Sequence, residues 1–168
     1  MDEAAGTTIT RTHHVGMSVA DIEAALGFWE KLLGHPARWR TVLDKPYLAR
    51  HVGYPGIVID AAFIDLPGGT VLELLQYRTD DKAALPDATA NPGNVHICLA
   101  VEDCGVAWRR AVELGARPIV PEGPVEVTHG PNAGARVAYL RVHDGITLEF
   151  YQAPAPNAAP AAATGAGR

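Results

Sequence analysis

Two histidines and two glutamates at matching places in two halves of the chain are the residues best suited to chemistry. His14 and His96 each open a stretch typical of a β-strand, and Glu73 and Glu149 each lie inside a later strand of the same half. Imidazole and carboxylate groups suit Ni, Co, Mn, Zn or Fe, and argue against copper(I) or an iron–sulfur cluster. The pattern therefore predicts a site for one divalent metal ion, whose identity the sequence leaves open.

The apolar surroundings of the two glutamates strengthen this prediction. Glu73 lies within 71–75 and Glu149 within 146–150, both strand-like and apolar. Burying a carboxylate is costly unless it is paired or coordinated. For either glutamate alone, a solvated sheet face or a hydrogen bond to a histidine is the simpler explanation. Two symmetric pairs favour a metal, and an octahedral ion with four protein ligands keeps two adjacent positions for a bidentate hydroxy-ketone.

The elements that must position these residues follow the same order in each half. Apolar residues at helical spacing and a closing glycine predict one helix per half, and β-rich runs separated by turn residues predict the strands. The first half gives a strand over 12–19, a helix over 22–33, and strands over 58–65 and 70–77. The second half gives a strand over 95–101, a helix over 105–114, a strand near Pro118, a long loop over 121–134 and a hairpin over 136–151.

Each half is thus βαβββ in outline, and one such module alone would leave its sheet edges open. We predict an α+β fold in which two tandem βαβββ modules form a curved, eight-stranded half-barrel sheet around the metal site. The predicted parts are a flexible N-terminus over 1–8, a first module over 9–79, a linker over 80–93, a second module over 94–152 and a disordered Ala/Pro-rich tail over 153–168.

Composition narrows the class of partner. The 168 residues carry a net charge of −5, which argues against a nucleic-acid partner because no basic stripe exists to neutralise phosphates. We find no apolar signal segment and no run of membrane-spanning length. The two cysteines, Cys98 and Cys104, are too few and too close to staple a fold, as expected in a reducing compartment. We expect a cytoplasmic protein that acts on a small molecule, without a nucleic-acid or membrane partner.

Candidate substrate contacts lie in two predicted loops. His51 and Tyr54 precede the strand over 58–65, and His129, Asn132 and Arg136 lie in or beside the Gly/Pro-rich loop. Loops carry binding residues disproportionately, so we predict that these side chains contact substrate. A plain surface role is the alternative for each of them.

Several motifs together resemble those of the vicinal oxygen chelate superfamily, which contains glyoxalase, bleomycin-resistance and extradiol dioxygenase proteins. The motifs are His14-Val15-Gly16, Leu66-Pro67-Gly68-Gly69 leading to Glu73, His96 followed by Val101-x-Asp103, and Asp144-Gly145 leading to Glu149. The resemblance covers residues 14–152 and implies a paired βαβββ fold with His14, Glu73, His96 and Glu149 as the metal ligands. Because paired-module members are often dimers, it also implies a homodimer.

The resemblance implies an enzyme, and its metal set is similar to that of metal-dependent glyoxalase I. Ser18 and Tyr77 stand where glutathione-binding members carry Arg and Asn, which argues against glutathione. A negative net charge with few lysines offers no obvious site for CoA phosphates. By elimination, the 2-epi-5-epi-valiolone epimerases of this superfamily are the narrower match. That match implies a metal-dependent isomerase or epimerase acting on a keto-cyclitol or sugar-like substrate.

Such an enzyme transfers a proton alpha to a carbonyl through a metal-bound enediolate, and Glu73 and Glu149 are the predicted catalytic residues. Whether each glutamate is ligand, base or both stays open, as does a base elsewhere. Also open is whether the site forms within one chain or between two. The alternatives are a glyoxalase I-like lyase, a metal-dependent dioxygenase, a thiol-transfer resistance enzyme and a non-catalytic drug-binding resistance protein.

Overall fold

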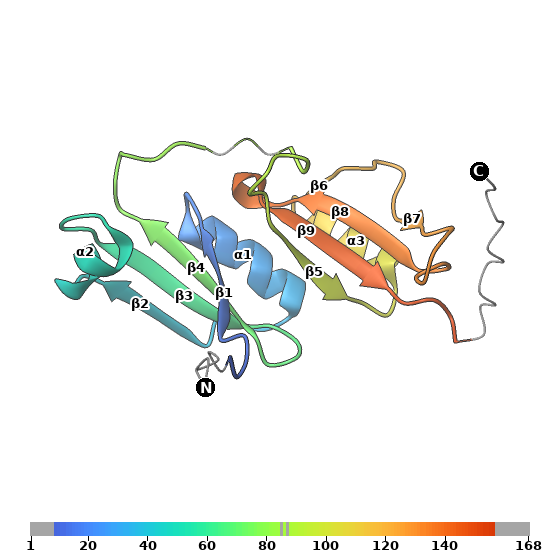
Figure 1. The fold of residues 1–168 in the computed structure, drawn as a ribbon, viewed down its shortest axis with the longest axis horizontal. Helices are drawn as coiled ribbons and strands as arrows, with labels where there is room; N and C mark the ends of the chain where they lie inside the picture. The colour runs from blue at the N-terminus through green and yellow to red at the C-terminus, as the bar shows by residue number, and fades with distance from the viewer. Residues whose placement is uncertain (1–8, 85, 87, 157–168) are drawn as a thin grey trace, which may run out of the picture. The chain divides into compact units, whose positions relative to one another are not determined.

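The chain forms two compact units that divide between Asp80 and Asp81. The computed structural model describes residues 9–84, 86 and 88–156, shown as a ribbon in Figure 1. The predictions made for residues 1–8, and for the tail beyond residue 156, lie outside the described residues. No helix in these described ranges is long and apolar enough to cross a bilayer.

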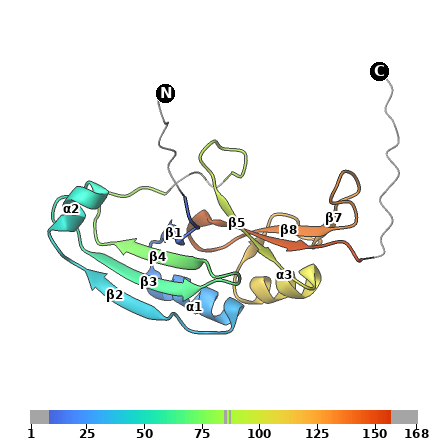
Figure 2. The ribbon, with the colours of Figure 1, turned by 60° about the horizontal axis from the view of Figure 1, so that its bottom comes forward.

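Unit 1 is a four-stranded sheet with strand order β1-β4-β3-β2. Strands β1 and β4 pair in parallel, whereas β4, β3 and β2 pair antiparallel. Helix α1 covers one face of this sheet, as Figure 2 shows. The elements are β1 (His14–Ser18), α1 (Ile22–Leu33), β2 (Trp39–Leu43), α2 (Tyr47–Val52), β3 (Ile59–Asp65) and β4 (Val71–Tyr77).

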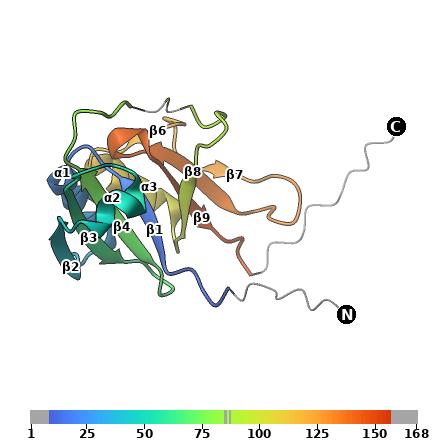
Figure 3. The same ribbon diagram turned by 60° about the vertical axis from the view of Figure 1, so that its left-hand side comes forward.

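Unit 2 repeats this plan with strand order β5-β9-β8-β6, and β7 also pairs with β8, beside which it lies in Figure 3. Strands β5 and β9 are parallel, as β1 and β4 are in unit 1. The elements are β5 (His96–Ala100), α3 (Cys104–Glu113), β6 (Arg117–Pro118), β7 (Val125–Glu126), β8 (Arg136–Arg141), the 3-10 turn η1 (His143–Gly145) and β9 (Thr147–Gln152).

The predicted α+β class with two repeated modules is confirmed, and the described residues form nine strands rather than eight. The difference arises in unit 2, where two short strands, β6 and β7, pair with β8 at different places along its length. Strand β7 lies inside the predicted loop over 121–134. The prediction gave no residue range for the remaining strand of the first module, which is β2, and it did not include helix α2, so His51 lies in a helix and not in a loop.

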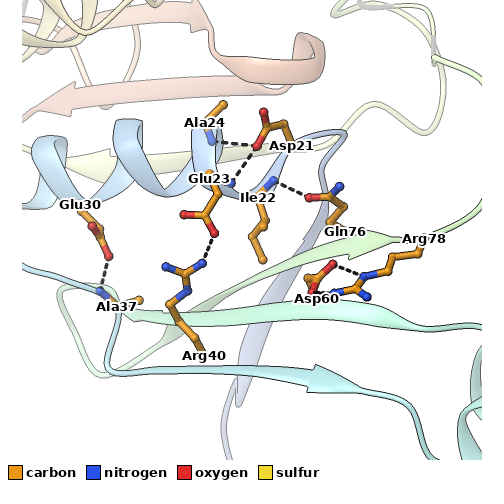
Figure 4. Close-up of polar contacts among 10 residues, drawn as sticks. All are labelled: Asp21, Ile22, Glu23, Ala24, Glu30, Ala37, Arg40, Asp60, Gln76 and Arg78. Atoms are coloured by element: carbon orange, nitrogen blue, oxygen red, sulfur yellow. Dashed lines mark hydrogen bonds and ion pairs between the residues drawn. The ribbon is translucent and has the colours of Figure 1, made fainter.

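Both units fix the start of their main helix by the same pair of contacts. Asp21 accepts hydrogen bonds from the backbone N–H groups of Glu23 and Ala24, at 2.9 and 3.1 Å. It thereby provides acceptors for N–H groups of the first turn, which have no partner within the helix. Gln76 Oε1, from the end of β4, accepts the N–H of Ile22 at 2.8 Å. Figure 4 shows these contacts in unit 1.

In unit 2, Asp103 accepts the N–H of Val106 at 2.9 Å, and Gln152 Oε1 accepts the N–H of Cys104 at 2.9 Å. Gln152 ends β9 as Gln76 lies near the end of β4. The strand that carries each central glutamate is therefore tied to the first residue of the helix in its own unit.

The core of unit 1 lies between α1 and the sheet, where Trp29, Leu72 and Leu74 are fully buried. The opposite face is partly covered too, because Leu48 of α2 packs with Ile57 and Ile59 in a smaller apolar cluster. Leu75 and Tyr77, partly buried, pack against this cluster, and they share a face of β4 with Glu73 because side chains alternate along a strand. Helix α2 therefore borders the face that carries Glu73.

Candidate metal centre

Glu73 lies in the middle of β4, directly opposite Gly16 of the parallel neighbour β1. His14 stands two residues earlier on β1, so strand alternation places its side chain on the same face. The His14 Nε2 and Glu73 Oε2 atoms are 3.3 Å apart. The histidine side chain is 42% exposed and the glutamate side chain 16% exposed, so solvent reaches the histidine more freely than the glutamate.

Unit 2 reproduces this arrangement. Glu149 of β9 lies opposite Cys98 of β5, and His96 opens β5 as His14 opens β1. The His96 Nε2 and Glu149 Oε2 atoms are 3.0 Å apart, and the two side chains have the same exposed fractions as their counterparts, 42% and 16%. The repeat seen in the sequence thus extends to side-chain geometry.

Each pair presents an imidazole nitrogen and a carboxylate oxygen side by side on a half-open face, and this donor set fits a divalent ion. The described residues contain no group of three or more His, Cys, Asp or Glu side chains that could hold a metal. The four predicted ligands meet as one pair in each unit. Their role as metal ligands therefore stays a prediction.

Glu149 has two further polar neighbours. Tyr139 of β8 lies opposite it in the sheet and its hydroxyl is 3.5 Å from His96 Nε2. Burial, the charge of Glu149 and a hydrogen bond to that carboxylate raise the pKa of Tyr139. The same three causes raise the pKa of the Cys98 thiol to about 12. Both groups are therefore protonated at neutral pH and able to donate hydrogen bonds to Glu149.

Glu73 has apolar neighbours at the same two positions. Phe63 of β3 lies opposite it, where Tyr139 lies opposite Glu149, and Gly16 replaces Cys98. Phe63 contacts Trp39 of β2, with ring centroids 4.9 Å apart. A Cβ atom added at Gly16 would lie 3.6 Å from Glu73 Oε2, in ordinary van der Waals contact. The carboxylate of Glu73 therefore lies directly over the glycine.

A recess of about 250 Å³ in unit 2 reaches Tyr139 and Glu149. Its other lining residues are mainly apolar, and they come from α3, β8 and the segment between β6 and β7: Trp108, Ile119, Val120, Gly123, Val125, Val137 and Ala138. Strand β6 pairs with one end of β8 and β7 with the other, so the recess lies where the edge passes from one short strand to the next. It gives the carboxylate of Glu149 an apolar wall.

A family model described as the Glyoxalase/Bleomycin resistance protein/Dioxygenase superfamily matches residues 13–139. The chain belongs to this superfamily. The match includes both predicted histidine ligands and confirms the resemblance to vicinal oxygen chelate proteins. A glyoxalase family protein from Bacillus cereus has the same fold, with a TM-score of 0.75, 21% identity, and coverage of 90% of this chain and 99% of that one.

Two sequence relatives of this superfamily member span most of its length. The uncharacterized protein YwbC of Bacillus subtilis is 30% identical over 145 residues, which cover 84% of this chain and 97% of that protein. A 2-epi-5-epi-valiolone epimerase from Actinomyces sp. is 28% identical over 148 residues, which cover 85% of this chain and 79% of the epimerase. Both relatives are similar to this chain over most of their own length.

The structure brings Tyr54 and Asn132, two of the predicted substrate contacts, to the glutamate-bearing faces. Tyr54 contacts Tyr77, with ring centroids 6.0 Å apart, and Tyr77 shares a face of β4 with Glu73. Asn132 Oδ1 accepts a hydrogen bond from the Tyr151 hydroxyl at 3.4 Å, and Tyr151 shares a face of β9 with Glu149. Through these two tyrosines, Tyr54 and Asn132 are therefore each linked to a sheet face that carries a His–Glu pair.

The other three predicted contacts are placed differently. His51 is exposed on α2, and His129 is exposed beside Thr128, whose hydroxyl is 2.8 Å from the His129 ring. Arg136 lies on the helix-facing side of β8, because it pairs in register with Gln152, which contacts the start of α3. The structure therefore does not bring Arg136 to the face of Glu149, and its predicted role stays untested.

Sequence reasoning missed Tyr139, Cys98 and Arg141. Arg141 is 5% exposed and donates hydrogen bonds to the Thr147 hydroxyl and to the Gly145 carbonyl. Nothing in its sequence context signals this burial. Tyr139 and Cys98 did carry a signal. Aligning the two halves on their glutamates places Tyr139 at the position of Phe63, and aligning them on their histidines places Cys98 at the position of Gly16.

Proposed function

We propose that this superfamily member is a divalent-metal-dependent isomerase or epimerase that transfers a proton at a carbon next to a carbonyl. The observation that carries the proposal is the repeated His–Glu pair, with separations of 3.3 and 3.0 Å and equal exposure in the two units. The relative named 2-epi-5-epi-valiolone epimerase supports a keto-cyclitol or sugar-like substrate.

The residues available for metal binding are His14, Glu73, His96 and Glu149. A bound divalent ion would polarise the substrate carbonyl as a Lewis acid and so make the adjacent C–H more acidic. The two glutamates then remove the proton and return it. Each is 16% exposed, so each reaches the open face of its sheet while remaining partly shielded from water, as a general base requires.

Other side chains prepare the surroundings of these carboxylates. The Tyr139 hydroxyl lies beside His96 Nε2 and Glu149, where it orients both groups. The mainly apolar lining of the recess beside Glu149 lowers the polarity on one side of that carboxylate, which strengthens electrostatic interactions there. Tyr54 and Asn132, held by Tyr77 and Tyr151, are the substrate contacts that the structure supports best.

Metal analysis and a hydrogen-exchange assay test the proposal. We expect the purified protein to carry a near-stoichiometric divalent metal, and a protein loaded with that metal to exchange the proton alpha to the carbonyl of 2-epi-5-epi-valiolone for deuterium in D₂O. The His14→Asn and His96→Asn variants should lose both metal and exchange. A His35→Gln variant is the matched control, because His35 lies exposed in the turn after α1.

Each alternative has its own outcome in these assays. No metal after reloading would refute the enzyme and leave a drug-binding protein. Turnover of the glutathione hemithioacetal of methylglyoxal would indicate a glyoxalase I-like lyase. Iron that is retained without Glu73, with consumption of dioxygen, would indicate a dioxygenase. A requirement for a thiol co-substrate would indicate a thiol-transfer enzyme.

The homodimer and the cytoplasmic location remain predictions, and whether one or two chains build the site can be tested by mixing variants. If one site takes its first pair from one chain and its second pair from the other, mixing His14→Asn with His96→Asn protein restores one intact site per mixed dimer. If each chain builds its own site, mixing restores none. Deuterium exchange measured after mixing and re-equilibration distinguishes the two arrangements.

A further inference from the structure

The outer edge of the sheet is built differently in the two units. In unit 1, β2 runs along β3 without interruption, and Trp39 stands directly opposite Phe63. In unit 2, Tyr139 takes the place of Phe63, because each lies opposite the central glutamate of its unit. The residue opposite Tyr139 is Ile119, whose backbone N–H donates to the Tyr139 carbonyl at 2.9 Å. An aliphatic side chain therefore stands in unit 2 where unit 1 has an indole ring.

Beyond this point the chain of unit 2 leaves the sheet edge before it returns as β7. Val125 is the next residue paired with β8, so residues 120–124 occupy a stretch that corresponds to Ala138 alone on β8. The Gly123 N–H donates to the Val120 carbonyl at 3.3 Å and closes a turn within this bulge. The recess of about 250 Å³ is lined by residues of the bulge, of β8 and of α3.

The matching place beside β3 in unit 1 is filled by an aromatic ring of the chain itself. The Trp39 and Phe63 rings have centroids 4.9 Å apart and planes inclined by 32°, within the range at which aromatic pairs attract. Pockets that enclose drug-sized ligands measure about 300–1,000 Å³, so the recess is large enough for one ring and a short substituent. Unit 1 thus indicates what fits beside Tyr139 in unit 2, which is a single ring packed against the tyrosine.

The charge of the recess narrows the ligand further. Its lining residues, all of them within the described part of the chain, include no Arg, Lys or His, and its one charged group is the Glu149 carboxylate. Glu149 already has His96 Nε2 at 3.0 Å, but a carboxylate has acceptor sites for several donors. In mainly apolar surroundings it favours a ligand that donates a hydrogen bond or carries a positive charge, and it disfavours an anion.

We propose that the recess beside Tyr139 binds a small molecule with one apolar ring that bears an amine or a hydroxyl group. The ring packs on Tyr139 and the polar group donates a hydrogen bond to Glu149. This inference goes beyond the proposed function, because the site lies within unit 2 and requires neither a metal ion nor a residue of unit 1.

Three probes that share a phenyl ring and differ in their polar group test the inference: benzylamine, benzyl alcohol and benzoate. Isothermal titration calorimetry at pH 7 is carried out on chelator-treated protein, because a bound divalent ion would itself attract benzoate. We expect benzylamine to bind with a Kd of about 1 mM or tighter. Benzyl alcohol should bind more weakly, and benzoate at least about tenfold more weakly than benzylamine. In Glu149→Gln the difference between benzylamine and benzoate should disappear.

Val120→Phe should weaken benzylamine binding about tenfold or more by filling the recess, since Val120 lines it and is 38% exposed. Val106→Phe is the matched control, because Val106 is 54% exposed on α3 and does not line the recess. Circular dichroism establishes that each variant is folded. The inference is overturned if benzylamine does not bind, if Val120→Phe binds it as tightly as Val106→Phe does, or if benzoate binds the wild type as tightly as benzylamine does.

Discussion

Replacing Gln76 with leucine should destabilise unit 1 by removing the tie between α1 and the strand that carries Glu73. Gln76 Oε1 accepts the N–H of Ile22 at 2.8 Å, and Ile22 is only 6% exposed. Leucine has a similar volume and no acceptor, so the N–H would lose its partner in a buried position. Such a loss costs about 1–3 kcal/mol of the free energy of unfolding. We expect a similar loss for Gln152→Leu, because Gln152 bonds to Cys104 at 2.9 Å.

Arg78→Leu is the matched comparison, because Arg78 lies just beyond β4 and also makes a polar contact. Its guanidinium donates two hydrogen bonds to Asp60, at 2.7 and 2.6 Å, but its side chain is 54% exposed. Solvent screening limits an exposed pair of this kind to about 1 kcal/mol or less. At neutral pH we therefore expect Gln76→Leu to cost more than Arg78→Leu.

The two losses should also respond differently to pH. The hydrogen bond from Arg78 lowers the pKa of Asp60 below the ordinary value of 3.8. The stability from this pair is therefore fully present above pH 3.8 and is lost as the pH falls through the lowered pKa. The cost of Arg78→Leu should shrink in acid, whereas an amide does not titrate and the cost of Gln76→Leu should persist.

Urea unfolding at pH 7 and near pH 3, followed by circular dichroism, measures both effects. The linear dependence of the free energy of unfolding on urea gives the difference between each variant and the wild type. A cost of Gln76→Leu no larger than that of Arg78→Leu at pH 7 would refute the reasoning. So would a cost of Gln76→Leu that disappears in acid together with that of Arg78→Leu.

Three further predictions follow from burial, thiol chemistry and metal linkage. Trp29→Ala should cost about 3–5 kcal/mol of stability, measured by urea unfolding, because Trp29 is completely buried. Cys98 should react slowly with iodoacetamide at pH 8 despite its exposure, since its pKa is about 12. Glu149→Gln should speed this reaction, which mass spectrometry can follow. Equal rates in the variant and the wild type would contradict the contact between Cys98 and Glu149. If the protein binds a divalent metal, free metal at 100 times the Kd should stabilise it by about 2.7 kcal/mol, and a chelator should reverse the gain in a thermal melt.

Elements with strong local signals could be predicted from the sequence, and elements held by tertiary contacts could not. The predicted bounds of α1 match the structure because Asp21 caps its start and Gly34, with φ of 81°, ends it. The bounds of strand β2 escaped prediction because β2 is an exposed edge strand whose pattern comes from pairing with β3. Helix α2 has six residues, no side-chain cap and a single buried residue, Leu48, so its stability comes from the cluster it joins.

The candidate site could be predicted as two pairs but not as two different environments. His14 with Glu73, and His96 with Glu149, follow from the repeat and from strand alternation. The neighbours of each glutamate depend on register, which the sequence alone did not fix. Register likewise decides that Arg136 faces α3, because a shift of one residue exchanges the two faces of a strand.

The pairing of the first strand of each unit with its last also bears on how the chain forms during synthesis. Strand β1 is made first, yet its partner within the described sheet is β4, the final strand of unit 1. On the ribosome, β1 therefore remains without its β4 partner until the rest of the unit has been synthesised. Pairing between strands far apart in the sequence is also slow to form. Strand β5 likewise remains without its partner until β9 has been synthesised. Slowing translation between β1 and β4 should thus lengthen the interval in which a chaperone can bind the nascent chain.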